Sequence, residues 1–180
     1  MCFTALDFYK AGLPLPRGKH AGDQPAGGTR LRDYIWQRQM DSLVPDASRF
    51  LAWLIILNHI PAAWPFKGGP AWLLAQSKRE WRRVRASLDT GEPIPIGLVR
   101  ETSNVFDNHQ VLAIGYEERG KDQAALFVYD PNCPDQVSAI SLTFGERMLH
   151  GQQSCGDVPP LRGLFCQTYK PRDPTAAIGS

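Results

Sequence analysis

The stretch NHQVLAIGYEERGKDQAALFVYDP, residues 108–131, decides the fold of the second half of the chain. Two apolar runs rich in β-branched and aromatic residues, 110–117 and 124–129, flank a polar segment of hairpin length, which predicts two antiparallel strands. In such a pair the start of one strand lies beside the end of the next. We therefore expect His109, which precedes the first strand, to lie beside Asp130, which ends the second.

The rest of the chain divides into a helical first half and a strand-rich second half. Apolar residues at helical spacing predict helices over 2–10, 29–43, 47–59 and 70–89, with Thr29 and Asp46 as N-caps and Pro70 at a first helical position. The helix over 47–59 is so apolar that we expect it to be buried on several sides. Further strands are predicted over 94–100, 137–144 and 164–169.

This order of elements predicts an α+β domain in which N-terminal helices pack on a C-terminal antiparallel β-sheet. We expect one domain over residues 1–171 and a flexible C-terminal tail over 172–180. A chain of 180 residues is long enough to bury one core, and its 43% hydrophobic and 21% charged residues exclude wholesale disorder.

Charge, hydropathy and cysteine spacing narrow the class of protein. A net charge of +2 gives no reason to expect nucleic acid or a charged membrane as a partner. No run approaches the ~18 apolar residues of a membrane span, and no signal peptide is visible, so we expect a cytoplasmic protein. The four cysteines show no C-x-x-C pair, which disfavours structural zinc and gives no disulfide framework. Two bridges stay open as an alternative if the protein is exported. Oligomeric state is not encoded in these patterns.

Three residues form the candidate catalytic site. A carboxylate such as Asp130 beside an imidazole such as His109 fixes the tautomer of the ring and stabilises the imidazolium that forms during catalysis. Cys2 opens a helix, whose free N–H groups and dipole lower the pKa of a thiol and favour the thiolate. We therefore predict Cys2 as the nucleophile, His109 as the base and Asp130 as the residue that orients His109.

These residues resemble those of the papain-like cysteine peptidase superfamily, most closely its peptidase C39-like branch. The resemblance rests on a cysteine at a helix start and on the motifs His109-Gln110-Val111, Gly115-Tyr116 and Val128-Tyr129-Asp130-Pro131. It implies a papain-like α+β fold and a Cys-His-Asp triad that acts as a thiol hydrolase of peptidase or amidase type. It also implies a peptide, a protein or a small amide as substrate, and no metal or other cofactor.

The chain departs from the family pattern in two ways. A glutamine a few residues before the cysteine usually supplies the second oxyanion donor, whereas only Met1 precedes Cys2 here. Gln110 and Asn108 are the candidate replacements, unless residues upstream of Met1 supply the donor. C39 peptidases of exporters are also fused to transporter parts and cleave leader peptides, and nothing of that kind is visible. Hydrolysis, acyl transfer and deamidation therefore all stay open.

Two alternatives come from other classes of protein. The first is an N-terminal-nucleophile amidohydrolase that uses Cys2 and its own amine and does not need His109. The second is a catalytically inactive papain-like domain that binds a partner through the tryptophan-rich middle, Trp53, Trp64, Trp72 and Trp81. A metal enzyme is disfavoured because the histidines are scattered and show no zinc-ligand spacing: His20, His59, His109 and His150.

Overall fold

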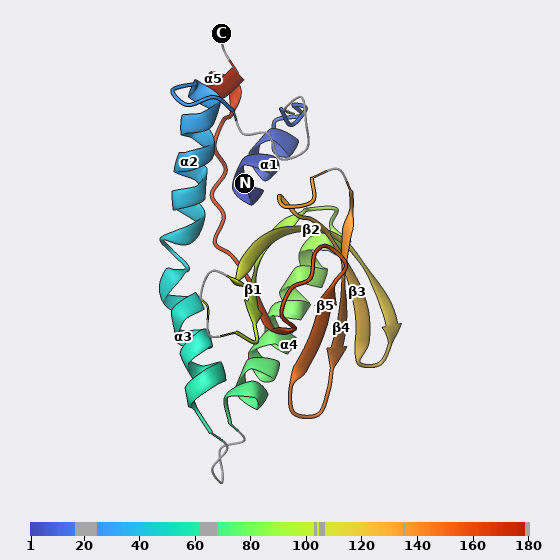
Figure 1. Ribbon diagram of the computed structural model, residues 1–180. Coiled ribbons are helices and arrows are strands. Elements are labelled where there is room, and N and C mark those ends of the chain that lie inside the picture. The colour runs from blue at the N-terminus through green and yellow to red at the C-terminus, as the bar shows by residue number, and fades with distance from the viewer. Residues whose placement is uncertain (17–24, 62–67, 103, 105–106, 135, 179–180) are drawn as a thin grey trace.

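The computed structural model describes residues 1–16, 25–61, 68–102, 104, 107–134 and 136–178 (Figure 1). The helices of the first half are α1 (Cys2–Lys10), α2 (Arg30–Leu43), α3 (Ala47–His59) and α4 (Gly69–Asp89). The strands of the second half are β1 (Ile94–Arg100), β2 (His109–Gly120), β3 (Gln123–Tyr129), β4 (Ser138–Phe144), β5 (Leu149–Gln153) and β6 (Leu161–Cys166). A short helix, α5 (Thr175–Ile178), follows them.

The six strands form one closed antiparallel barrel, in the order β1 to β6, with β1 paired to both β2 and β6. Helices do precede strands as expected, but the prediction of a papain-like fold, with helices packed on an open sheet, is wrong. The strand that the sequence did not predict is β5, which reads Leu-His-Gly-Gln-Gln and contains no β-branched residue. It lies between β4 and β6 and completes the ring.

The hairpin of β2 and β3 forms as expected. Leu112 pairs with Tyr129 and Ala113 with Val128 in antiparallel register, and the register shifts between Ala113 and Gly115. The first strand is longer than predicted and runs to Gly120. The pairing therefore brings the beginning of β2 and the end of β3 to one end of the barrel.

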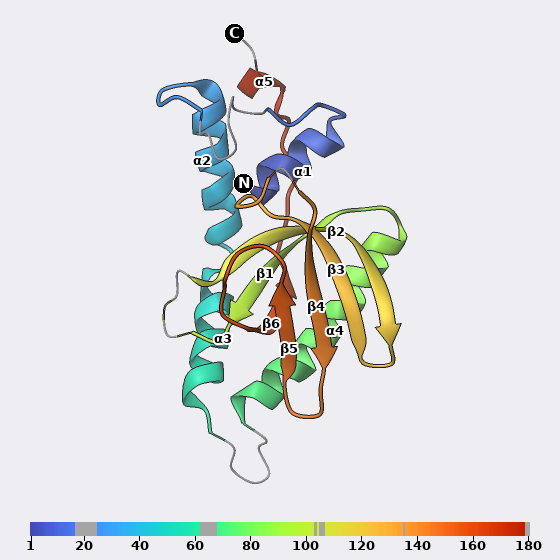
Figure 2. The ribbon, with the colours of Figure 1, turned by 45° about the vertical axis from the view of Figure 1, so that its right-hand side comes forward.

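Alternation of side chains along the strands separates two hydrophobic clusters. The larger cluster joins one face of all six strands to α4, through Leu74, Trp81 and Val84. The smaller cluster lies on the other face of β1 and β6, where Val99 and Phe165 meet residues of α3 and α4. Figure 2 shows α4 running across one side of the barrel, while α1, α2 and α5 gather above one end of it.

The helices begin and end where the apolar spacing predicted, although two local expectations fail. The Thr29 side chain caps α2 by accepting a hydrogen bond from the Arg32 N–H, at 3.3 Å. Asp46 makes no such cap, because its carboxylate accepts from the Thr168 N–H instead. The α3 helix is not buried on several sides, since Leu51 and Ile55 are 56% and 46% exposed.

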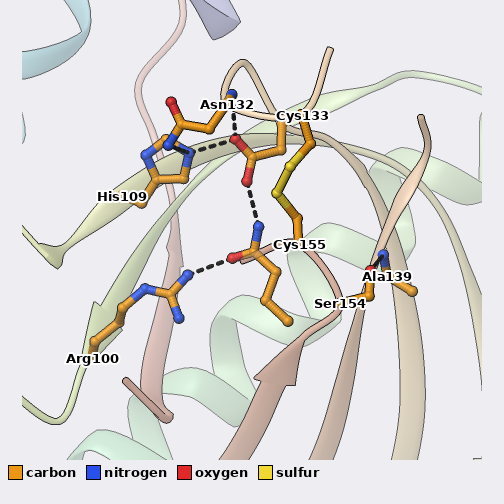
Figure 3. Close-up of a disulfide and its surroundings, with 9 residues drawn as sticks. Arg100, His109, Asn132, Cys133, Ala139, Ser154 and Cys155 are labelled. Carbon is orange, nitrogen blue, oxygen red and sulfur yellow. Dashed lines mark hydrogen bonds and ion pairs between the residues drawn. A yellow bond between two sulfur atoms is a disulfide. The ribbon is translucent and has the colours of Figure 1, made fainter. Parts of the chain in front are cut away.

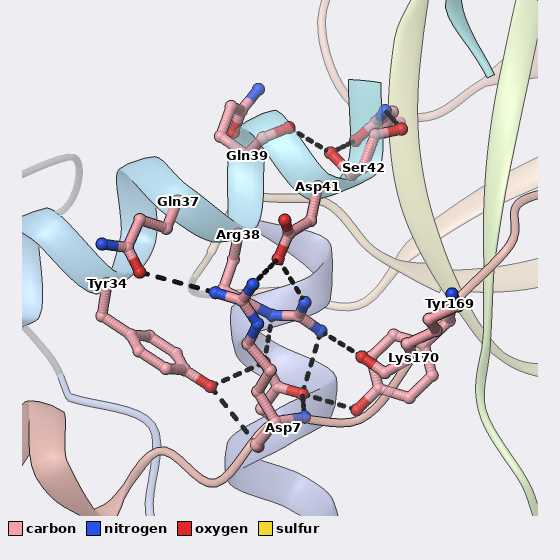
Figure 4. Close-up of polar contacts among 11 residues, drawn as sticks. Asp7, Tyr34, Gln37, Arg38, Gln39, Asp41, Ser42, Tyr169 and Lys170 are labelled. Carbon is pink, nitrogen blue, oxygen red and sulfur yellow. Dashed lines mark hydrogen bonds and ion pairs between the residues drawn. The ribbon is translucent and has the colours of Figure 1, made fainter. Parts of the chain in front are cut away.

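A buried carboxylate, Asp7, attaches α1 to the rest of the molecule (Figure 4). Its oxygens accept hydrogen bonds from Arg38 and Tyr34 of α2, from the Tyr169 hydroxyl and from the Arg172 backbone N–H. Within the segment expected as a flexible tail, residues 175–178 form α5, which packs on α2 and buries Ala177.

Replacing Asp7 by alanine is expected to destabilise the protein by about 3–5 kcal/mol, because the Arg38 guanidinium is then left buried without its main partner. Urea unfolding of both proteins measures the difference. Asp157→Ala, which removes an exposed carboxylate, serves as the control and is expected to change stability by less than ~0.5 kcal/mol. Equal losses in the two variants would show that the Asp7 network does not hold α1.

Candidate active site at the mouth of the barrel

The side chains of His109 and Asp130 lie at one end of the barrel. His109 and Val111 lie on the same face of β2, because side chains alternate along a strand, and Val111 belongs to the cluster inside the barrel. Asp130 directly follows β3, and the register places it opposite Val111 and diagonal to His109. The end of the barrel is therefore closed by polar groups rather than by apolar ones.

His109 and Asp130 meet as the sequence predicted. The Nε2 atom of the His109 ring lies 2.7 Å from Oδ1 of Asp130. Burial by itself raises the pKa of the Asp130 carboxyl, but hydrogen bonds from His109, the Asn132 backbone N–H and Gln153 outweigh it, so that the pKa lies below its ordinary value. Because an ionised carboxylate can only accept, Nε2 donates this hydrogen bond, which leaves Nδ1 as the ring atom that can take up a proton.

Two further buried side chains, Gln153 and Arg100, hold the other oxygen of the Asp130 carboxylate (Figure 3). The Gln153 amide donates to Oδ2 of Asp130 and accepts at Oε1 from the guanidinium of Arg100. Arg100 also donates to the Pro159 carbonyl, at 2.9 Å, and is 2% exposed. The chain of hydrogen bonds from Arg100 to His109 thus spans four elements or loops of the barrel mouth.

Cys2 lies beside this group but not on the His109 ring. Its thiol donates to the backbone carbonyl of Gln110, at 3.3 Å, and packs with Leu112 on the outer face of β2. The expectation that the helix start lowers its pKa is wrong in this structure. Burial raises the pKa of the Cys2 thiol to about 12, against the opposing effect of the Met1 ammonium, and the Asp130 charge adds to the rise.

The two amides predicted as oxyanion donors are engaged elsewhere. The Gln110 side chain is buried against α2, where it accepts from the Ser42 hydroxyl at 3.0 Å and donates to the Ser42 carbonyl. Asn108 Oδ1 accepts from the Arg100 backbone N–H, also at 3.0 Å. The exposed amide beside the ring is that of Asn132, whose Nδ2 lies 3.5 Å from His109 Nε2.

A disulfide between Cys133 and Cys155 flanks the site (Figure 3). The spacing of the cysteines did not predict this disulfide, because the two residues are 22 positions apart in different loops. Gln153 and Arg100 were missed for the same reason: each is far from Asp130 in the chain, and only the closure of the barrel brings them together. The remaining free cysteines of the described chain, Cys2 and Cys166, are both buried.

Other regions offer less chemistry. Among the described residues, no three His, Cys, Asp or Glu side chains lie close enough together to hold a metal ion. Two open hollows, of about 230 and 450 Å³, lie around Lys78 and Lys121, near the turn after β2 and hence at the far end of that strand from His109. In the described part of the chain, no helix combines the length and the apolar character needed to cross a membrane. His20 and Trp64 lie outside the described residues.

Alkylation measures the state of Cys2. Because the thiol is 1% exposed and its pKa is raised to about 12, we expect iodoacetamide to label Cys2 of the folded protein at pH 7 at least ~100-fold more slowly than in urea. Intact mass spectrometry with peptide mapping gives the rates, and the buried Cys166 thiol is the internal comparison. Fast labelling of Cys2 in the folded protein would contradict this arrangement.

Acid titration measures the state of Asp130. Since its pKa is lower in the folded than in the unfolded chain, its contribution to stability is complete above about pH 4 and is lost as the pH falls through the folded pKa. We expect the stability difference between the wild-type protein and Asp130→Asn to shrink as the pH falls below about 4, as followed by urea unfolding at each pH. A stability difference that grows as the pH falls would show that the pKa of Asp130 is raised and not lowered on folding.

Comparison of the chain with protein-family models, with curated proteins and with solved structures finds no match. The similarity to papain-like peptidases therefore rests on the motifs around Cys2, His109 and Asp130 alone.

Proposed function

We propose that the protein is a cysteine-nucleophile hydrolase of peptidase or amidase type, in which Cys2 attacks a carbonyl and His109 moves the proton. The observation that carries the proposal is the pairing of His109 with a buried, ionised Asp130, next to a strand residue whose carbonyl holds the Cys2 thiol. A carboxylate bonded to an imidazole supplies a base of fixed orientation, and Cys2 is held by the carbonyl of Gln110, which follows His109 in β2.

The resting thiol is neutral, so the mechanism does not start from a preformed thiolate. Substrate first displaces Cys2 from the Gln110 carbonyl, and the thiol then gives its proton to Nδ1 of His109 as the sulfur attacks. His109 returns that proton to the leaving group. Water attacks the resulting thioester, with His109 as base again, and regenerates the thiol.

The oxyanion of the intermediate needs two donors. The backbone N–H of Cys2 at the start of α1 is one, because the first N–H groups of a helix have no partner within the helix. We assign the second to the exposed side-chain amide of Asn132, in place of Gln110 and Asn108, because it lies beside the His109 ring. The substrate class stays as expected from the motifs: a peptide, a protein or a small amide.

A second function is favoured by one observation, the complete burial of the Cys2 thiol. If the Cys2 thiol keeps its hydrogen bond to the Gln110 carbonyl and reacts with no acyl donor, the domain is a non-catalytic binding module. Trp53 and Trp81, two of the tryptophans proposed as its binding surface, do not fit that role, because both are core residues. The N-terminal-nucleophile alternative fits less well still, since Cys2 lies on a helix and not on a strand.

Hydrolysis of p-nitrophenyl acetate tests the proposal without knowledge of the natural substrate. We expect a thioester on Cys2, detected by intact mass spectrometry, and release of nitrophenolate that Cys2→Ala abolishes. His109→Ala is expected to lower the rate by about 10²–10⁴-fold and Asp130→Asn to lower it less. Cys166→Ser, which removes the other buried free thiol, is the matched control and should hydrolyse the ester at the wild-type rate. Equal rates for wild type and Cys2→Ala would leave the binding module as the function.

A further inference from the structure

The Cys133–Cys155 disulfide joins the two segments that hold Asp130. Cys133 follows Asp130 by three residues, in a turn where its N–H donates to the Asp130 carbonyl at 2.9 Å. Cys155 follows Gln153 by two residues, and Gln153 donates to the Asp130 side chain. The same two segments are therefore connected twice, once by the sulfur bridge and once by the hydrogen bond to the carboxylate.

Regular strand pairing ends close to both segments. Gln153 is the last residue of β5 to pair with β4, opposite Ile140. On its other side β5 is joined to β6 by the single register pair of Gly151 with Leu161. Residues after Gln153 and after Asp130 are in irregular structure as far as they are described. Two hydrogen bonds between Ser154 and Ala139, at 2.8 and 2.9 Å, continue the contact with β4 by one residue, and the disulfide at Cys155 is the covalent restraint beyond them.

Asp130 is sensitive to a small displacement of its partners. The residue is 1% exposed, and burial of its charge is compensated by the three hydrogen-bond donors from His109, Asn132 and Gln153. Arg100, also buried, reaches the carboxylate only through Gln153. Movement of Gln153 would leave a desolvated carboxylate and a desolvated guanidinium without their bridge, so the orientation of His109 would be lost with it.

We propose that Cys133 and Cys155 are positioning residues of the site, whose disulfide keeps Gln153 on Asp130, so that only the oxidised protein is competent. This inference rests on the proposed function, because competence means that His109 can serve Cys2. A small dithiol reduces the protein. The two thiols of the reagent become a disulfide, and the two electrons and two protons that they lose convert the Cys133–Cys155 bridge to two cysteine thiols. The protein would then work in an oxidising compartment rather than in the expected cytoplasm.

The burial of Cys2 fits the same setting. In an oxidising compartment an exposed reactive thiol exchanges with disulfides, whereas the Cys2 sulfur is covered by α1 residues, Leu112 and the Gln110 carbonyl. A free nucleophile and a bridged pair can therefore persist in one molecule until substrate uncovers Cys2.

The test compares the oxidised protein, the same protein reduced with dithiothreitol, and the double variant Cys133→Ser/Cys155→Ser. Two quantities are measured: the titration of the Asp130 carboxyl by carbon-13 NMR, assigned with Asp130→Asn, and the rate of Cys2 acetylation by p-nitrophenyl acetate. We expect the pKa of Asp130 to rise on reduction and in the double variant, and acetylation to slow by about 100-fold. Reoxidation restores both in the wild type and neither in the variant.

Val84→Ala is the matched control, because it destabilises the barrel from α4 while it keeps the disulfide. It should leave the Asp130 titration unchanged. An identical Asp130 titration in oxidised and reduced protein overturns the inference. Unfolding on reduction, with Val84→Ala still folded, overturns it too, because the bridge then supports the whole fold. A shifted Asp130 titration without acetylation in any form supports the positioning role and sinks the proposed hydrolase function instead.

Discussion

The buried ion pair between Asp7 and Arg38 is the constraint on which the arrangement of this protein depends. The α1 helix is not part of the barrel, and its apolar contacts with the strands are few. Asp7, whose side chain is 0% exposed, instead ties α1 to α2 through Arg38 and to the C-terminal segment through Tyr169 and Arg172. Because α1 begins at Cys2, this network also fixes where the candidate nucleophile sits on β2.

A balance between burial and hydrogen bonding explains why the Asp130 carboxyl is ionised and the Cys2 thiol is protonated. Burial by itself would raise the pKa of both the Asp130 carboxyl and the Cys2 thiol. Asp130 is compensated by donors from three sides, so that it stays ionised, whereas the Cys2 thiol finds only a carbonyl, which favours the protonated sulfur. In the proposed function, His109 is a base beside a protected Cys2, and the step that uncovers Cys2 is the point at which substrate would control the reaction.

Buried polar side chains at the end of the barrel are stabilised by hydrogen bonds to one another. Arg100, Gln153 and Asp130 are buried charges and amides that satisfy one another, and none of them is a neighbour of another in the chain. Such a network specifies one arrangement when it is complete and costs stability when one member is removed. The Cys133–Cys155 bridge lies just beyond the last residue pair of β4 and β5, and it adds a covalent restraint on this arrangement.

The sequence by itself determined the local structure: helices α1 to α4, the hairpin of β2 and β3, and the meeting of His109 with Asp130. These follow from periodicity, from capping and turn residues, and from the geometry of antiparallel neighbours. The tertiary structure alone decided that the sheet closes, because β5 lacks a strand pattern and is held by its neighbours on either side. It also decided the partners of Asp130, the bridge between Cys133 and Cys155 and the burial of Cys2, since burial and long-range pairing depend on which distant segments pack together.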